Sequence, residues 1–161
     1  MSYMGDKNQA VIDFLMTCPK IANNKLFFNF INGKDNDKQF VTVANDKSVN
    51  RPYIDGSVLK RYTFTIIDYR SVAYQALVVG GGYPNENVEE MFDVQSIMDW
   101  IEEQADAQNF PDFGSECIID SMRTLADTPR LNGVDTNVTP VLAKYSMSIQ
   151  IDYIDISKRI Y

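Results

Sequence analysis

The sequence predicts an α+β fold, in which a mainly antiparallel β-sheet carries two α-helices packed on one face. Three observations predict it: several runs alternate apolar and polar residues with a period of two, two segments repeat apolar residues at helical spacing, and strand links are of hairpin length. A parallel βαβ arrangement is disfavoured because the strand candidates are not continuous apolar runs. The 161 residues, 45% of them hydrophobic, suit a single domain spanning residues 1–161.

The first third of the chain predicts one helix and a hairpin. Residues 7–18 repeat apolar side chains at i, i+3, i+4 and i+7, and a proline follows to stop the helix. Two strand-like runs, 25–31 and 39–44, are expected to pair antiparallel across the polar turn 32–38. Residues 45–56 are expected to be a polar loop.

The middle of the chain predicts a long strand and the longer helix. Residues 57–70 alternate but leave open which face is buried, and residues 71–79 are either a bulged continuation or a separate short strand. The helix is expected over residues 88–109, with Asn85 or Asn87 as its N-cap. The apolar stripe and its two flanking aromatics are Met91, Val94, Met98, Ile101 and Ala105, with Phe92 and Trp100.

The C-terminal third predicts two further strands. Residues 117–125 form the first, and the second follows a connection that contains Pro129, Gly133 and Pro140. The alternation in the second is the cleanest in the chain, which is typical of a strand with one face buried and one in water. The apolar face of this strand consists of Tyr145, Met147, Ile149, Ile151 and Tyr153.

The composition argues against several kinds of chemistry. The chain has no histidine, which removes histidine-activated nucleophiles and imidazole zinc sites. Cys18 and Cys117 share no CxxC context and are expected to be reduced thiols, with a disulfide as the alternative. The net charge of −7, without any basic run, disfavours nucleic-acid binding.

The motifs that resemble chemical sites are incomplete. The triglycine at residues 80–82 lacks the lysine and the spacing of a phosphate loop, and acidic residues follow it. Asp68, Asp120 and Asp152 are expected to be isolated exposed charges whose loss has little effect. The sequence therefore predicts no catalytic residue, no metal site and no bound cofactor.

Five short segments, spread over about residues 50–155, form a series that carries a resemblance. They are residues 52–57 (PYIDGS), 98–106 (MDWIEEQAD), 110–113 (FPDF), 129–135 (PRLNGVD) and 140–149 (PVLAKYSMSI). In this order they resemble the tail terminator or minor capsid proteins found at the head–tail junction of long-tailed bacteriophages and phage-tail-like particles.

The resemblance implies a structural virion protein that is not an enzyme. Such subunits form a ring, usually a hexamer, which caps the head-proximal end of the tail tube, stops tube polymerisation and docks the neck proteins. The implied partners are further copies of the chain, the tail tube protein, head-completion or neck proteins and, in a contractile tail, the sheath protein. The particle would be assembled in the host bacterial cytoplasm. Alternatives are another neck or head-completion protein, or a small cytosolic ligand-binding α+β domain.

Two regions are candidates for the contact between ring subunits. One is the apolar face of the last strand, because tyrosines are favoured where a flat sheet meets a partner. The other is the polar loops 32–38 and 45–56, which are expected to be mobile until neighbours order them. No membrane partner is expected, since no apolar run approaches about 18 residues. The candidate interface residues are Tyr145, Met147, Ile149, Ile151, Tyr153, Asn32, Gly33, Lys34 and Asp35.

Overall fold

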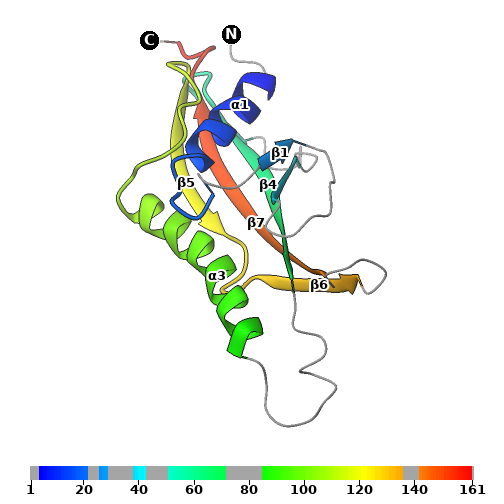
Figure 1. The fold of residues 1–161 in the computed structure, drawn as a ribbon. Helices are drawn as coiled ribbons and strands as arrows, with labels where there is room; N and C mark the ends of the chain where they lie inside the picture. Colours follow the sequence, from blue (N-terminus) through cyan, green and yellow to red (C-terminus); the bar gives the residue numbers. More distant parts are fainter. Residues whose placement is uncertain are drawn as a thin grey trace.

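The structure is a computed structural model that describes residues 4–21, 26–28, 38–42, 51–71, 85–135 and 142–160. Within these residues, two helices lie on one side of a curled, mainly antiparallel sheet, so the predicted α+β class is confirmed (Figure 1). The elements, in chain order, are α1 (Met4–Leu15), β1 (Leu26–Phe28), β2 (Lys38–Thr42), β3 (Arg51–Pro52), β4 (Val58–Ser71), α3 (Asn85–Asp106), β5 (Cys117–Thr124), β6 (Arg130–Asp135) and β7 (Leu142–Asp155).

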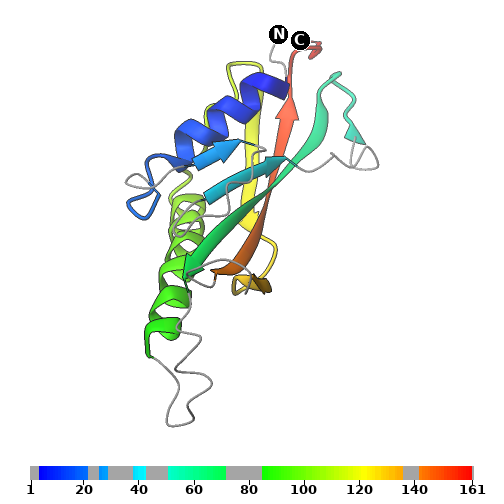
Figure 2. The ribbon, with the colours of Figure 1, turned by 45° about the vertical axis from the view of Figure 1, so that its right-hand side comes forward.

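Two long strands form the spine of the sheet. β4 and β7 pair antiparallel along all 14 residues of each, from Val58 opposite Asp155 to Ser71 opposite Leu142. β2 and β3 pair with the free edge of β4, while β5 and β6 pair with the free edge of β7 (Figure 2). Every described strand except β1, which pairs with β2, therefore hydrogen-bonds to one of these two.

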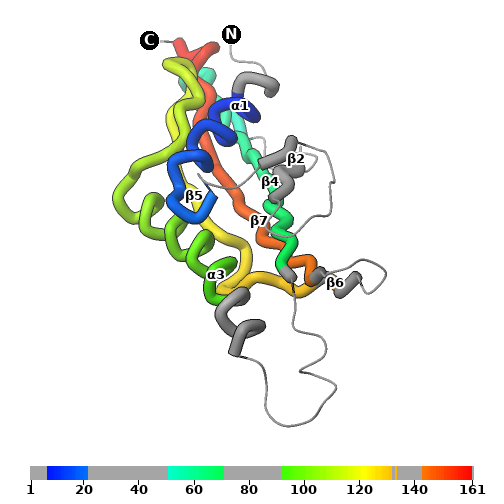
Figure 3. The backbone as a smooth tube through the Cα atoms, viewed as in Figure 1, coloured from blue at the N-terminus to red at the C-terminus, as the bar shows by residue number. Residues whose placement is uncertain are grey.

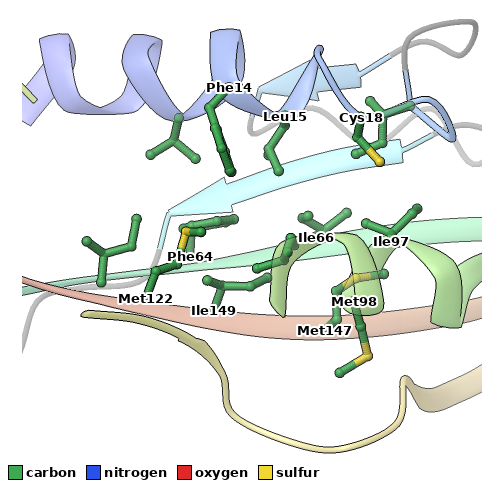
Figure 4. Close-up of a cluster of buried hydrophobic side chains, with 14 of the residues drawn as sticks. Phe14, Leu15, Cys18, Phe64, Ile66, Ile97, Met98, Met122, Met147 and Ile149 are labelled. Atoms are coloured by element: carbon green, nitrogen blue, oxygen red, sulfur yellow. The ribbon is translucent and has the colours of Figure 1, made fainter. Parts of the chain in front are cut away.

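Both helices pack on the same face of this spine. α1 lies over the end of the sheet near the C-terminus, and α3 runs beside β5 toward the opposite end (Figures 1 and 3). Side chains from both helices meet the inward side chains of β4 and β7 in one apolar core (Figure 4). The core members from the helices are Val11, Phe14, Leu15 and Cys18 on α1 and the turn after it, with Val94, Ile97, Met98 and Ile101 on α3.

The register decides which face of β4 is buried, a point that the sequence leaves open. Tyr62, Phe64 and Ile66 are at most 1% exposed and lie opposite the apolar residues of β7. Since side chains alternate across a strand, the odd-numbered residues of β4 lie on the other face of the sheet. The apolar alternation of β7 is confirmed, because its five predicted inward residues are all buried.

Helix α3 confirms most of the predicted stripe. Val94, Met98 and Ile101 are buried as expected, and Ile97, which the predicted stripe omits, is buried with them. Phe92 does not extend the stripe, because its side chain is 64% exposed on the outer surface. The side chain of Met91 lies outside the described part of the structure.

The ends of α3 differ from the expected 88–109. The helix begins at Asn85, so Asn87 lies inside it, and it ends at Asp106 rather than at residue 109. The backbone N–H of Asn109 donates to the carbonyl of Gln104, and that of Gln108 to the carbonyl of Ala105. With Gln108 at a φ of 56°, this is a Schellman motif, which ends a helix by satisfying its last carbonyls.

Three expectations about the strands are corrected. The pair β1–β2 is parallel, so the expected hairpin over 32–38 is wrong, since a hairpin turn would reverse the chain direction. The connection before β7, in which no strand was expected, contains the strand β6. The expected loop 45–56 includes β3, while the rest of that loop before Arg51 and the turn 32–37 lie outside the described residues.

We expect Met98→Asp to unfold the protein. Met98 is 2% exposed inside the core, so the variant would bury a carboxylate without a partner. A loss of about 3–5 kcal/mol of unfolding free energy is expected from chemical denaturation. Phe92→Asp, on the exposed side of the same helix, is the control and should change stability by less than about 1 kcal/mol. Equal stability of the two variants would show that the helix face has been assigned wrongly.

Candidate functional site

The apolar face of β7 belongs to the subunit's own core. Tyr145, Met147, Ile149, Ile151 and Tyr153 are between 0% and 7% exposed. As candidate interface residues they are therefore misplaced, since the helices already cover the face that was expected to meet a partner. The other candidates, Asn32, Gly33, Lys34 and Asp35, lie outside the described residues, as does the triglycine 80–82.

Aromatic packing explains why two tyrosines sit inward on these strands. The ring of Phe113 packs edge-on against Tyr62 at 5.6 Å and against Tyr153 at 5.4 Å between centroids. Burial raises the pKa of the Tyr153 hydroxyl to about 12. The Tyr62 hydroxyl donates to the side-chain oxygen of Asn8 on α1. The hydrogen bond therefore holds α1 against the sheet, and the ring contacts hold the segment after α3 against it.

The opposite face of the spine is the open sheet face, which no described helix covers. It is built from the outward residues of β4 and β7, which face each other in cross-strand pairs such as Arg61 with Asp152 and Thr65 with Ser148. By register its members are Leu59, Arg61, Thr63, Thr65, Ile67 and Tyr69 on β4, and Lys144, Ser146, Ser148, Gln150, Asp152 and Ile154 on β7.

A polar cluster occupies the middle of the open sheet face. Arg61 Nε donates to Asp152 Oδ1 at 2.9 Å. Gln150 is 6% exposed and, with its amide oxygen turned toward the arginines, accepts from Arg123 Nη2 at 3.0 Å and from Arg61 Nε at 3.1 Å. One carboxylate and one amide oxygen thus hold two guanidinium groups beside each other, leaving net positive charge.

A second polar cluster lies on the core side, at the far end of β4. Arg70 Nε and Nη2 each donate at 3.1 Å to one oxygen of Asp68, and the two side chains are almost fully buried. Arg70 also approaches Asp93 of α3 at 3.7 Å, and Asp93 pairs with Lys20 at 3.1 Å. The cluster therefore links β4, α3 and the turns after α1.

This cluster corrects the expectation that Asp68 is an isolated exposed charge. Asp68 is 0% exposed and paired, so its loss leaves the Arg70 guanidinium in the core with its main acceptor gone. The sequence does indicate an inward position for both residues, because Asp68 and Arg70 continue the inward alternation of Tyr62, Phe64 and Ile66. Asp152 is also paired, whereas Asp120 is exposed at the bulge of β5.

A third feature is the corner formed by the β3–β4 hairpin and the C-terminal segment. Arg159 Nε donates to Asp55 Oδ2 at 2.9 Å, and hydrogen bonds from the Ser57 hydroxyl and amide lower the pKa of Asp55, with Arg159 adding to the effect. Gly56, at a φ of 88°, has no room for a side chain, since a Cβ would lie 2.3 Å from the Lys158 carbonyl oxygen. Beside this corner, Ile54 is fully exposed.

Two shallow, open depressions are lined entirely by described residues, and the corner borders one of them. The first, about 590 Å³, is lined by residues of the β3–β4 turn with Ile154 and Arg159. The second, about 490 Å³, lies between α1 and residues 110–112. Ligand sites usually have a few convergent polar groups in an enclosed pocket, and neither depression has that form.

In the described part of the chain, no three His, Cys, Asp or Glu side chains gather as metal ligands. Cys18 and Cys117 are reduced thiols that form no disulfide, as expected, with Cys18 buried and Cys117 half-buried. Burial raises the pKa of the Cys117 thiol. The helices of the described residues include none long and apolar enough to cross a membrane.

Comparison with known proteins adds no assignment. No protein-family model and no curated protein matches this chain.

We expect Asp68→Ala to cost about 3–5 kcal/mol of unfolding free energy, because it removes the carboxylate that accepts two hydrogen bonds from the buried Arg70 guanidinium. The double change Asp68→Leu with Arg70→Met should recover much of that loss, since an apolar pair needs no ionic partner. Asp120→Ala is the control and should stay within about 0.5 kcal/mol of wild type. Chemical denaturation measures all three, and wild-type stability of Asp68→Ala would contradict the buried pairing.

Proposed function

We propose that the chain is a structural subunit of a phage-like particle that acts as a tail terminator. In this role, copies of the chain form a ring on the head-proximal end of the tail tube. The ring stops tube growth and provides the docking surface for the neck proteins. Ring formation and docking both depend on contacts between proteins, and neither requires a catalytic residue.

The observation that carries this proposal is the one-sided sheet. One face is filled by the subunit's own helices, whereas the open sheet face presents a broad polar surface over two 14-residue strands. An antiparallel sheet commonly packs one face on the core and leaves the other in solvent, so the open sheet face is available for a contact with a neighbour. A subunit of a ring needs such a surface for its neighbours, and it needs no enclosed pocket.

The segments that carry the family resemblance support a shared fold more than a shared surface. Met98 and Ile101 of the second segment, Phe113 of the third, and Tyr145 and Ile149 of the last are all core residues. Core packing sets the architecture that a ring subunit needs. The ring contacts would instead be made by exposed side chains, whether or not these belong to the five segments.

Electron microscopy of particles made without this gene tests the proposal. A terminator is expected to leave tail tubes of uncontrolled length that do not join heads, and supplying the gene in trans should restore uniform tails. Tails of normal length that lack heads would contradict termination and would indicate a neck protein. Normal infectious particles would contradict both roles.

A further inference from the structure

The acidic charge of the chain is concentrated in one helix. α3 contains eight of the 22 acidic residues and none of the 15 Lys and Arg residues, so its formal charge is −8. The whole chain carries −7, which leaves the rest of the protein at +1. The overall acidity is therefore a property of α3 alone, and a partner will meet an acidic helix on an otherwise nearly neutral subunit.

The outer side of α3 is exposed, and its acidic charge is only partly compensated within the described part of the chain. Asp93 pairs with Lys20 and Arg70, and Glu102 accepts hydrogen bonds from Thr124. Asp99, Glu103 and Asp106 are exposed and form no ion pair within the described part of the chain. Phe92, 64% exposed on the same helix, adds an aromatic side chain of the kind that anchors protein interfaces.

The open sheet face has the opposite charge. Arg61 and Lys144 belong to it, and register places Arg123 on β5 and Arg130 on β6 on the same side, opposite Gln150 and Ser146. Among the residues whose side chains the structure describes, the carboxylates on this face are Asp152, which is paired with Arg61, and Asp120 at the β5 bulge. Arg123, Arg130 and Lys144 have no carboxylate partner among the described residues.

We propose that these two surfaces bind each other between copies of the chain: the acidic outer side of α3 of one subunit docks on the basic open sheet face of the next. The inference rests on the proposed function, which requires a ring, and it names the contact that would close it. Complementary charge steers such an encounter and fixes its orientation.

The geometry of the subunit favours a head-to-tail contact. α3 packs on the core side of the sheet, so its outer side and the open sheet face lie on opposite sides of the molecule. A two-fold dimer that brought α3 against α3, or sheet against sheet, would place like charges together, which is repulsive. A contact between different surfaces repeats from copy to copy, and it produces a ring when the rotation closes.

Charge reversal in purified protein tests the contact. Wild-type protein should self-associate in sedimentation experiments as concentration rises, and the association should weaken as ionic strength goes from about 0.05 M to about 1 M, where screening acts within about 3 Å. Arg123→Glu and Glu103→Lys should each weaken association by about tenfold or more. The double variant, and an equimolar mixture of the two single variants, should recover it, because each restores opposite charges across the contact.

Lys158→Glu is the matched control, since it makes the same charge change at an exposed residue outside both surfaces. It should associate like wild type, and all variants should keep wild-type thermal stability. A protein that stays monomeric at every concentration, or an association that ignores salt and both reversals, overturns the proposed contact. The terminator role would survive that result, because it fails only if particles lacking the gene keep tails of uniform length.

Discussion

The pairing of β4 with β7 is the constraint on which the rest of the structure depends. The two strands share one uninterrupted 14-residue register, and nearly every other described strand attaches to one of them. Because side chains alternate across a strand, this single register places Tyr62, Phe64 and Ile66 together with the apolar residues of β7 on one face. A shift of this register by one residue would point all of these apolar side chains toward the solvent. The helices, the core and the open sheet face all follow from it.

The same constraint separates stability from interaction. The core face holds the apolar side chains, the edge-on contacts of Phe113 with Tyr62 and Tyr153, and the buried Asp68–Arg70 pair. None of these side chains is exposed to a partner. Among the described residues, the open sheet face and the outer side of α3 are two exposed surfaces, and they differ in charge. Changes on the core face should therefore act through folding, and changes on these two outer surfaces through assembly. This division makes a surface-based function experimentally separable from the stability of the subunit.

Periodicity in the sequence predicts the elements well and their partners poorly. The α+β class, both helices and the buried face of β7 follow from local alternation, which depends on each segment alone. The parallel β1–β2 pair does not follow, since strand direction depends on long-range placement. The candidate interface on β7 was predicted wrongly, because alternation shows that a strand face is apolar without showing whether the chain's own helices cover that face. Asp68 was misjudged for a similar reason: its partner, Arg70, becomes evident only once both are placed inward.

Hydrogen exchange of the native protein, resolved by residue, tests the central role of the β4–β7 pairing most directly. If this pairing supports the whole domain, the hydrogen-bonded amides at the centre of both strands should exchange slowest, with an opening free energy equal to that of global unfolding. The amides of α3 and of the short strands should open at lower cost. Slower exchange in α3 than in the centre of β4 and β7 would contradict the account, since it would show that the domain's most stable unit lies elsewhere.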